Sequence, residues 1–193
     1  MSTLAYDLTR EADRVFARLM VRAARDGNDR AFAAMIATRA AGGGALPAWL
    51  GLELSEFRDL MAHHFPGVSP DVLSAIDSGQ PLTGARQDER DELIELMLTH
   101  RANRTLSEVW MARVVAAGCM ASDHLWQDLG LWERPELTAL MNRNFPTLAE
   151  RNTKDMKWKR FLYKQLCEAE GIYVCRSPSC EVCVDYHVCF ESD

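Results

Sequence analysis

The sequence predicts an all-α protein, a helical bundle that continues into an irregular, cysteine-rich loop. Apolar residues recur at spacings of three and four along most of the chain, which is the period of a helix. The alternating β-branched residues that mark strands are scarce. With 193 residues, 48% of them hydrophobic and 26% charged, the chain is long enough to bury a core of its own.

The expected helices can be placed in order from their apolar faces and from turn-forming residues. The faces are Leu8, Val15, Leu19 and Met20 in the first helix, Phe32, Met35 and Ile36 in the second, Phe57, Leu60, Met61 and His64 in the third, Leu93, Leu96, Met97 and His100 in a later one, and Trp110 and Val114 in the next. We expect the first helix to end near residues 26–28 and the second at three glycines, 42–44. Ser69-Pro70 predicts the N-cap of a further short helix.

Two stretches of the chain resemble each other at an offset of 79 to 80 residues. The matching pieces are Leu50-Gly51-Leu52, Leu60-Met61 and Phe65-Pro66 in the first stretch, and Leu129-Gly130-Leu131, Leu140-Met141 and Phe145-Pro146 in the second. We interpret them as two similar helical units that share one core. Chance similarity between two amphipathic helices is the alternative.

The composition changes near residue 151, which predicts a division into a helical body (residues 1–150) and a C-terminal segment (151–193). All four lysines of the protein lie between Thr153 and Gln165. Thr153 is expected to cap a helix, which should end at Gly171. The apolar face of that helix is Trp158, Phe161, Leu162 and Leu166.

Basic residues form a stripe beside this apolar face, namely Lys157, Arg160 and Lys164. A cationic stripe can concentrate an oxyanion. The alternative is a solvated basic face that balances negative charge elsewhere in the segment.

The C-terminal segment contains four closely spaced cysteines, Cys175, Cys180, Cys183 and Cys189, in the pattern C-x4-C-x2-C-x5-C. In a reducing compartment such clusters hold a metal or do redox chemistry more often than they form disulfides. Thiolates are soft ligands that select iron–sulfur clusters, zinc or copper(I). A structural zinc site usually pairs two separated C-x2-C knuckles. The single C-x2-C with flanking cysteines therefore favours an iron–sulfur cluster, and zinc stays open.

The two other cysteines and the histidines are further candidate ligands. Cys119 and Cys167 are expected to be buried helix residues, and His187, within the cysteine run, could bind a metal or donate a hydrogen bond to a cluster sulfur. Adjacent residues of a helix point about 100° apart. We therefore expect capping or surface roles for His63, His64 and His124 rather than one compact site.

Charge and motif content exclude several function classes. The chain has 22 Lys and Arg against 28 Asp and Glu, a net charge of −6, so it lacks a basic field for nucleic acid. It has neither an apolar stretch of about 20 residues nor a signal peptide, so we expect a cytoplasmic protein without a membrane partner. Glycine-rich phosphate loops and common hydrolase motifs are missing from the sequence, which disfavours a nucleotide-dependent enzyme.

Ahead of the C-x4-C-x2-C-x5-C run, the C-terminal segment contains Lys157-Trp158-Lys159-Arg160-Phe161-Leu162-Tyr163 and Leu166-Cys167-Glu168. With these motifs the segment resembles the NifQ family of nitrogen-fixation accessory proteins. The resemblance implies a molybdenum-carrying iron–sulfur protein that supplies molybdenum for the nitrogenase iron–molybdenum cofactor, assembled on scaffold and maturation proteins. It also implies that Cys175, Cys180, Cys183 and Cys189 hold the cluster.

Two other functions stay open beside this one. A small electron-transfer protein would carry a conventional iron–sulfur cluster without molybdenum, and a zinc-stabilised interaction module would be colourless. The function that the resemblance implies is one of metal binding and delivery, in which the cluster carries the chemistry.

Overall fold

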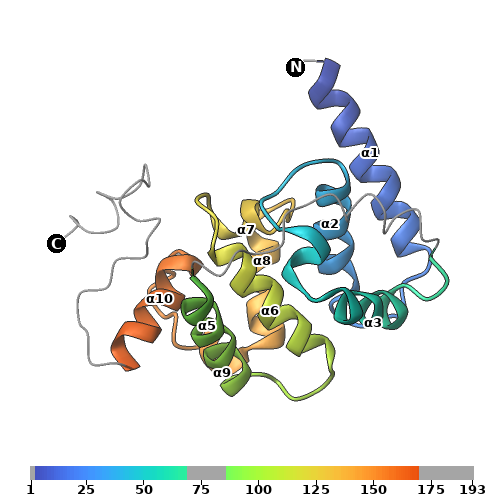
Figure 1. Cartoon of the computed structure of the whole chain (residues 1–193). Coiled ribbons are helices and arrows are strands. Elements are labelled where there is room, and N and C mark those ends of the chain that lie inside the picture. Colours follow the sequence, from blue (N-terminus) through green and yellow to red (C-terminus); the bar gives the residue numbers. More distant parts are fainter. Residues whose placement is uncertain (1–2, 69–85, 170–193) are drawn as a thin grey trace.

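The computed structural model describes residues 3–68 and 86–169, and every regular element in these two ranges is a helix (Figure 1). The elements are α1 (Thr3–Met20), α2 (Asp29–Ala40), the 3-10 helix η1 (Ala48–Gly51), α3 (Leu54–His64), α5 (Gln87–Thr99), α6 (Ser107–Cys119), α7 (Leu125–Asp128), α8 (Arg134–Asn144), α9 (Pro146–Ala149) and α10 (Trp158–Ala169). The all-α prediction is confirmed for this part of the chain. None of the helices described here has both the length and the apolar character needed to cross a bilayer.

Helix α6 lies at the centre of the core. Its residues from Met111 to Gly118 are buried with the exception of Arg113, as expected of a helix that is covered on nearly all sides. Helix α1 packs against α2, and α5 packs against α6. Phe32, Phe57, Phe65 and Phe145 belong to the same core and are almost completely buried.

The first expected helix ends earlier than its sequence suggests. We expected it to reach residues 26–28, but α1 ends at Met20. The chain then turns at Arg25, which has a left-handed φ of 70°, and the Ala24 N–H donates to the carbonyl of His64 at 2.9 Å. These contacts hold the α1–α2 loop against the C-terminal end of α3, so the backbone there is not available for helical hydrogen bonds.

The last helix begins later than expected. Thr153 does not cap it, since α10 starts at Trp158. The Asn152 side chain closes a local turn instead, accepting from the Met156 N–H at 2.8 Å and donating to the Met156 carbonyl at 3.0 Å. Asp155 in this turn has a φ of 48°, which a helix does not allow.

The predicted apolar face of this helix is present. Trp158, Phe161 and Leu162 are buried within the same core cluster as the rest of the protein, and Leu166 packs against it. Helix α10 contacts α5. The division at residue 151 stays a prediction, and the short helix expected at Ser69-Pro70 and the stop at Gly171 lie outside the described residues.

Helices α3 and α8 lie in the two stretches of sequence that resemble each other, and they share local structural features. Each has 11 residues and begins with a capping box, formed by Glu53 with Glu56 in α3 and by Glu133 with Glu136 in α8. The phenylalanine that follows each helix has nearly the same backbone angles, φ −134° and ψ 59° in one and φ −133° and ψ 57° in the other. Gly51 and Gly130, in the two Leu-Gly-Leu pieces, both have a positive φ, which glycine adopts without strain.

Candidate metal-binding sites

The predicted cluster ligands Cys175, Cys180, Cys183 and Cys189 lie outside the described residues, as does His187. Ala169, the last residue of α10, is also the last described residue. Helix α10 is therefore the element that leads toward the cysteine run. The contacts that hold α10 against the helical body therefore matter for any site in the residues that follow α10.

A buried ion pair fastens the beginning of α10. Lys159 is only 8% exposed, and its ammonium contacts the carboxylate of Asp128 at the end of α7. Lys159 Nζ also donates to the carbonyls of Ala121 and Asp123, each at 2.8 Å. Because an ammonium has three donors, all of them are used. Burial raises the pKa of Asp128, although the Lys159 ammonium opposes this shift.

A second polar cluster fastens the middle of α10. The Tyr163 hydroxyl donates to Glu89 of α5, and the Arg86 guanidinium donates to the same carboxylate, with Nε 2.7 Å from Oε2. Arg86 also donates to the Tyr163 hydroxyl at 2.7 Å and to the Met120 carbonyl at 3.0 Å. Burial acts to raise the pKa of Glu89, but the hydrogen bonds from Arg86 and Tyr163 outweigh it and keep that pKa below its ordinary value.

The predicted basic stripe is partly engaged by the protein itself. Lys157 and Arg160 are half-buried, whereas Lys164 is exposed, with its Nζ 3.4 Å from Glu168 one turn further along α10. Lys157 precedes the first residue of α10. Whether the stripe binds an oxyanion stays a prediction.

The two remaining cysteines differ in exposure. Cys119 is fully buried at the end of α6, which confirms the expected core role. Burial raises the pKa of its thiol to about 12, so the reactive thiolate is almost absent at neutral pH. Cys167 is half-buried on α10.

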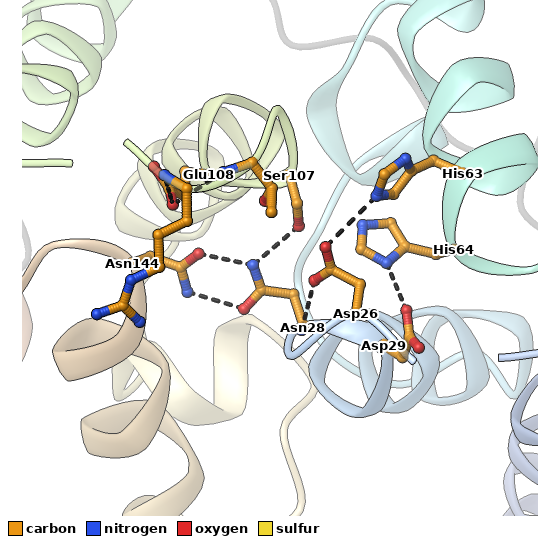
Figure 2. A network of polar contacts seen from close by, with 10 residues as sticks. Asp26, Asn28, Asp29, His63, His64, Ser107, Glu108 and Asn144 are labelled. Carbon is orange, nitrogen blue, oxygen red and sulfur yellow. Dashed lines mark hydrogen bonds and ion pairs between the residues drawn. The ribbon is translucent and has the colours of Figure 1, made fainter. Parts of the chain in front are cut away.

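Two adjacent histidines at the end of α3 come together with an aspartate from the α1–α2 loop (Figure 2). The rings of His63 and His64 lie 4.8 Å apart, and Nε2 of His63 is 3.4 Å from Oδ2 of Asp26. The three residues offer donor atoms that all lie within 4.8 Å of one another.

His63 is exposed, as expected of a surface residue, but our expectation that the two histidines would not form one compact group is wrong. The 100° rule describes the directions in which side chains leave the helix, whereas the rings extend beyond Cβ and can turn toward one another. His64 is also fully buried, so neither a cap nor a surface role describes it. His124 lies at the N-cap position of α7 without a side-chain capping bond.

A second carboxylate orients the buried histidine. Asp29, the first residue of α2, accepts a hydrogen bond from Nδ1 of His64 over 2.6 Å. Burial lowers the pKa of His64, and the hydrogen bond to Asp29 only partly offsets this effect. Oδ2 of Asp29 and Nε2 of His64 have no hydrogen-bond partner among the described residues.

The same loop carries a buried amide pair. Asn28 and Asn144, the last residue of α8, exchange two hydrogen bonds, 2.6 Å from Asn28 Nδ2 and 2.9 Å from Asn144 Nδ2. Asn28 Nδ2 also donates to Ser107 Oγ of α6 at 2.8 Å. The last residue of α3, His64, and the last residue of α8, Asn144, therefore both contact the start of α2 or the loop before it (Figure 2).

Several of these residues could not be singled out from the sequence. Asp26 lies 37 residues before His63, and neither is part of a recognised ligand motif. Lys159 did carry a signal, because it stands one turn before the buried Leu162 and Tyr163 on the same side of α10.

The fold and the sites define a protein whose described residues form only helices as regular elements, and whose last described helix leads to a run of four cysteines. Comparison with known proteins gives its family. The NifQ family model matches residues 31–191. The chain is 46% identical to Protein NifQ of Azotobacter vinelandii over an alignment of 156 residues, which covers 77% of this chain and 80% of that protein.

Two further relatives agree. Protein NifQ of Rhodobacter capsulatus is 36% identical over 155 residues, 80% of this chain and 82% of that protein. Protein NifQ of Klebsiella pneumoniae is 34% identical over 163 residues, 78% of this chain and 91% of that protein. The chain belongs to the NifQ family, whose members are involved in nitrogen fixation. No solved structure matches it.

Proposed function

We propose that this protein carries molybdenum in an iron–sulfur cluster and supplies it for biosynthesis of the nitrogenase iron–molybdenum cofactor. The observation that carries the proposal is the C-x4-C-x2-C-x5-C run within a NifQ family match that extends to residue 191. The match therefore includes all four cysteines. The protein acts by binding and delivery, not as an enzyme, and its partners are the cofactor scaffold and maturation proteins.

The donor set suits such a cargo. Four thiolates are soft ligands that iron–sulfur clusters require, and molybdenum in a sulfide-bridged cluster has the same preference. Cys175, Cys180, Cys183 and Cys189 are the ligands in this proposal. Molybdate is the source of the metal, and Lys157, Arg160 and Lys164 attract this oxyanion toward the run.

The anchoring of α10 supports delivery by ligand exchange. Lys159 and Tyr163 fix the helix to α7 and α5 through buried or half-buried polar contacts. Ligands can then be exchanged in the following cysteine run while the helical body keeps its fold. A partner protein would take the metal without the unfolding of α10.

Metal analysis of protein purified without oxygen tests the proposal. We expect molybdenum and iron in the full chain, with a brown colour from sulfide-to-iron charge transfer. Serine substitution of any one of the four cysteines should lower both metals and the capacity to complete a cofactor-deficient nitrogenase. Cys119→Ala is the matched control, because Cys119 lies in the core and should not affect metal content.

The alternatives give different results in the same experiment. Iron without molybdenum and reversible redox cycling would identify an electron-transfer protein. A colourless protein with one zinc per chain would identify a zinc-stabilised module. For the basic stripe, replacing Lys157, Arg160 and Lys164 by glutamine should lower molybdenum and leave iron nearly unchanged, whereas equal loss of both metals would indicate a structural role.

We also propose that the helical body consists of two similar units. The matching capping boxes, helix lengths and phenylalanine backbone angles of α3 and α8 support this, together with the two left-handed glycines. If the units are related, exchanging α3 and α8, each with its capping box, should give a folded protein. An exchange that leaves no cooperative unfolding transition would contradict the proposal.

A further inference from the structure

We propose that Asp26, His63 and His64 form a second metal site, which binds one divalent transition metal ion of the class of Zn²⁺, Co²⁺ and Fe²⁺. The site lies between the α1–α2 loop and the end of α3, and α3 and α10 are on opposite sides of the molecule (Figure 1). It is therefore separate from the helix that leads to the cysteine run.

The donor atoms are spaced for a single ion. Metal–ligand bonds of about 2.0–2.1 Å in a tetrahedral shell place neighbouring donors about 3.3 Å apart. Nε2 of His63 and Oδ2 of Asp26 are already 3.4 Å apart. All three donor atoms lie within 4.8 Å of one another, so small side-chain rotations bring the third into the same shell.

The buried histidine supplies the strongest indication of a ligand. His64 is 0% exposed, and its Nε2 has no hydrogen-bond partner among the described residues. In Figure 2 the ring nitrogen that does not face Asp29 is on the side of His63 and Asp26. A buried polar atom without a partner destabilises the fold, and a bound metal ion would satisfy it.

Asp29 prepares His64 for this role. A carboxylate only accepts hydrogen bonds, so the proton of the neutral ring stays on Nδ1, 2.6 Å from Asp29 Oδ1. Nε2 then carries the lone pair, on the side of the ring where His63 and Asp26 lie (Figure 2). This is the arrangement in which a second carboxylate orients a metal-binding histidine.

Of the other two ligands, Asp26 is held by a hydrogen bond and His63 is open to solvent. Asp26 Oδ1 accepts the Asn28 N–H at 2.9 Å, which leaves Oδ2 for the ion. The side chain of His63 is 42% exposed, so an ion can enter from solvent and keep water in a fourth position. Two imidazoles and one carboxylate favour a divalent transition ion over the hard cations Mg²⁺ and Ca²⁺.

Cobalt titration of a chain without the tail thiolates tests the proposal. The parent for this experiment has serine at positions 175, 180, 183 and 189, so its outcome does not depend on whether the cysteine run binds a cluster. Stripped of metal and titrated with Co²⁺ without oxygen, it should develop visible d–d absorption that saturates at one ion per chain. Added Zn²⁺ should displace the cobalt and remove the absorption.

Substitutions then assign the ligands. His63→Ala and Asp26→Asn should each weaken Co²⁺ binding at least tenfold, and Asp29→Asn should weaken it about 10–100-fold through the orientation of His64. His100→Ala is the matched control, because His100 is bonded to Thr147 elsewhere in the protein. It should bind as the parent does.

Two results would overturn the proposal. One is a parent chain that shows no saturable Co²⁺ absorption at one equivalent. The other is a His63→Ala chain that binds Co²⁺ as tightly as the parent. Because His63 is partly exposed, its replacement should leave the helical circular dichroism unchanged, and binding can be compared at equal fold.

Discussion

Lys159→Met removes the ammonium that neutralises the buried carboxylate of Asp128. Methionine keeps the apolar stem of the side chain and its packing, so the change removes only the ammonium and its polar contacts. It leaves Asp128, with a side chain 2% exposed, without its counterion, and it leaves the carbonyls of Ala121 and Asp123 without their donor.

The size of the effect follows from this burial. Breaking a buried ion pair by removal of one partner costs about 3–5 kcal/mol. For a domain of this length each kcal/mol lowers Tm by roughly 2–4 °C, so we expect a Tm lower by roughly 6–20 °C. The double variant Lys159→Met, Asp128→Leu should recover more than half of the loss, because an apolar pair no longer buries an unpaired charge.

The loss should also depend on pH. Burial already raises the pKa of Asp128, and loss of the ammonium raises it further. A group whose pKa is raised on folding stabilises the fold below its unfolded pKa, and this contribution is lost as pH rises through the folded pKa. The difference in Tm between wild type and Lys159→Met should therefore be larger at pH 8 than at pH 5.

Thermal unfolding followed by circular dichroism measures these differences. Lys154→Met is the matched control, since Lys154 is exposed in the turn before α10 and should change stability by less than about 0.5 kcal/mol. A Lys159→Met protein with the same Tm as Lys154→Met would refute the reasoning, as would a double variant less stable than Lys159→Met.

Three further outcomes are expected. Asn144→Ala breaks the buried amide pair and should cost about 2 kcal/mol in urea unfolding, and a loss below about 0.5 kcal/mol would contradict this. Cys119 should resist iodoacetamide in the native protein and react only on unfolding, which mass spectrometry of the alkylated peptide detects; rapid native labelling would show that the thiol is accessible. Because the pKa of Glu89 is lowered, its stabilisation is present above the unfolded pKa of about 4.5 and is lost as pH falls. The Tm advantage of wild type over Glu89→Gln should shrink below that pH, and a constant difference from pH 7 to pH 3 would count against the cluster with Arg86 and Tyr163.

The sequence was informative where a helix has one apolar side. Phe57, Leu60 and Met61 predicted α3, and Trp158, Phe161 and Leu162 predicted the buried side of α10. These predictions succeeded because burial of apolar side chains is what orients each helix.

The polar contacts could not be predicted from the apolar pattern. The position of Lys159 on the buried side of α10 could be inferred from the sequence, but its partner could not, because Asp128 lies 31 residues away. The meeting of Asp26 with His63 depends on a loop that turns at Arg25. Loop conformation of this kind is set by tertiary contacts such as the one between Ala24 and His64, which leave no periodic trace in the chain.

The amide pair of Asn28 and Asn144 limits how the helices can assemble. Two packed apolar helix surfaces can shift along each other at little cost, whereas two paired amides form their hydrogen bonds at only one register. A slip of α8 by one helical turn, about 5.4 Å, would leave both amide oxygens without their donors, at a cost of about 1–3 kcal/mol each. Misaligned packings are thereby disfavoured, and a single native arrangement is selected from several that hydrophobicity alone would accept.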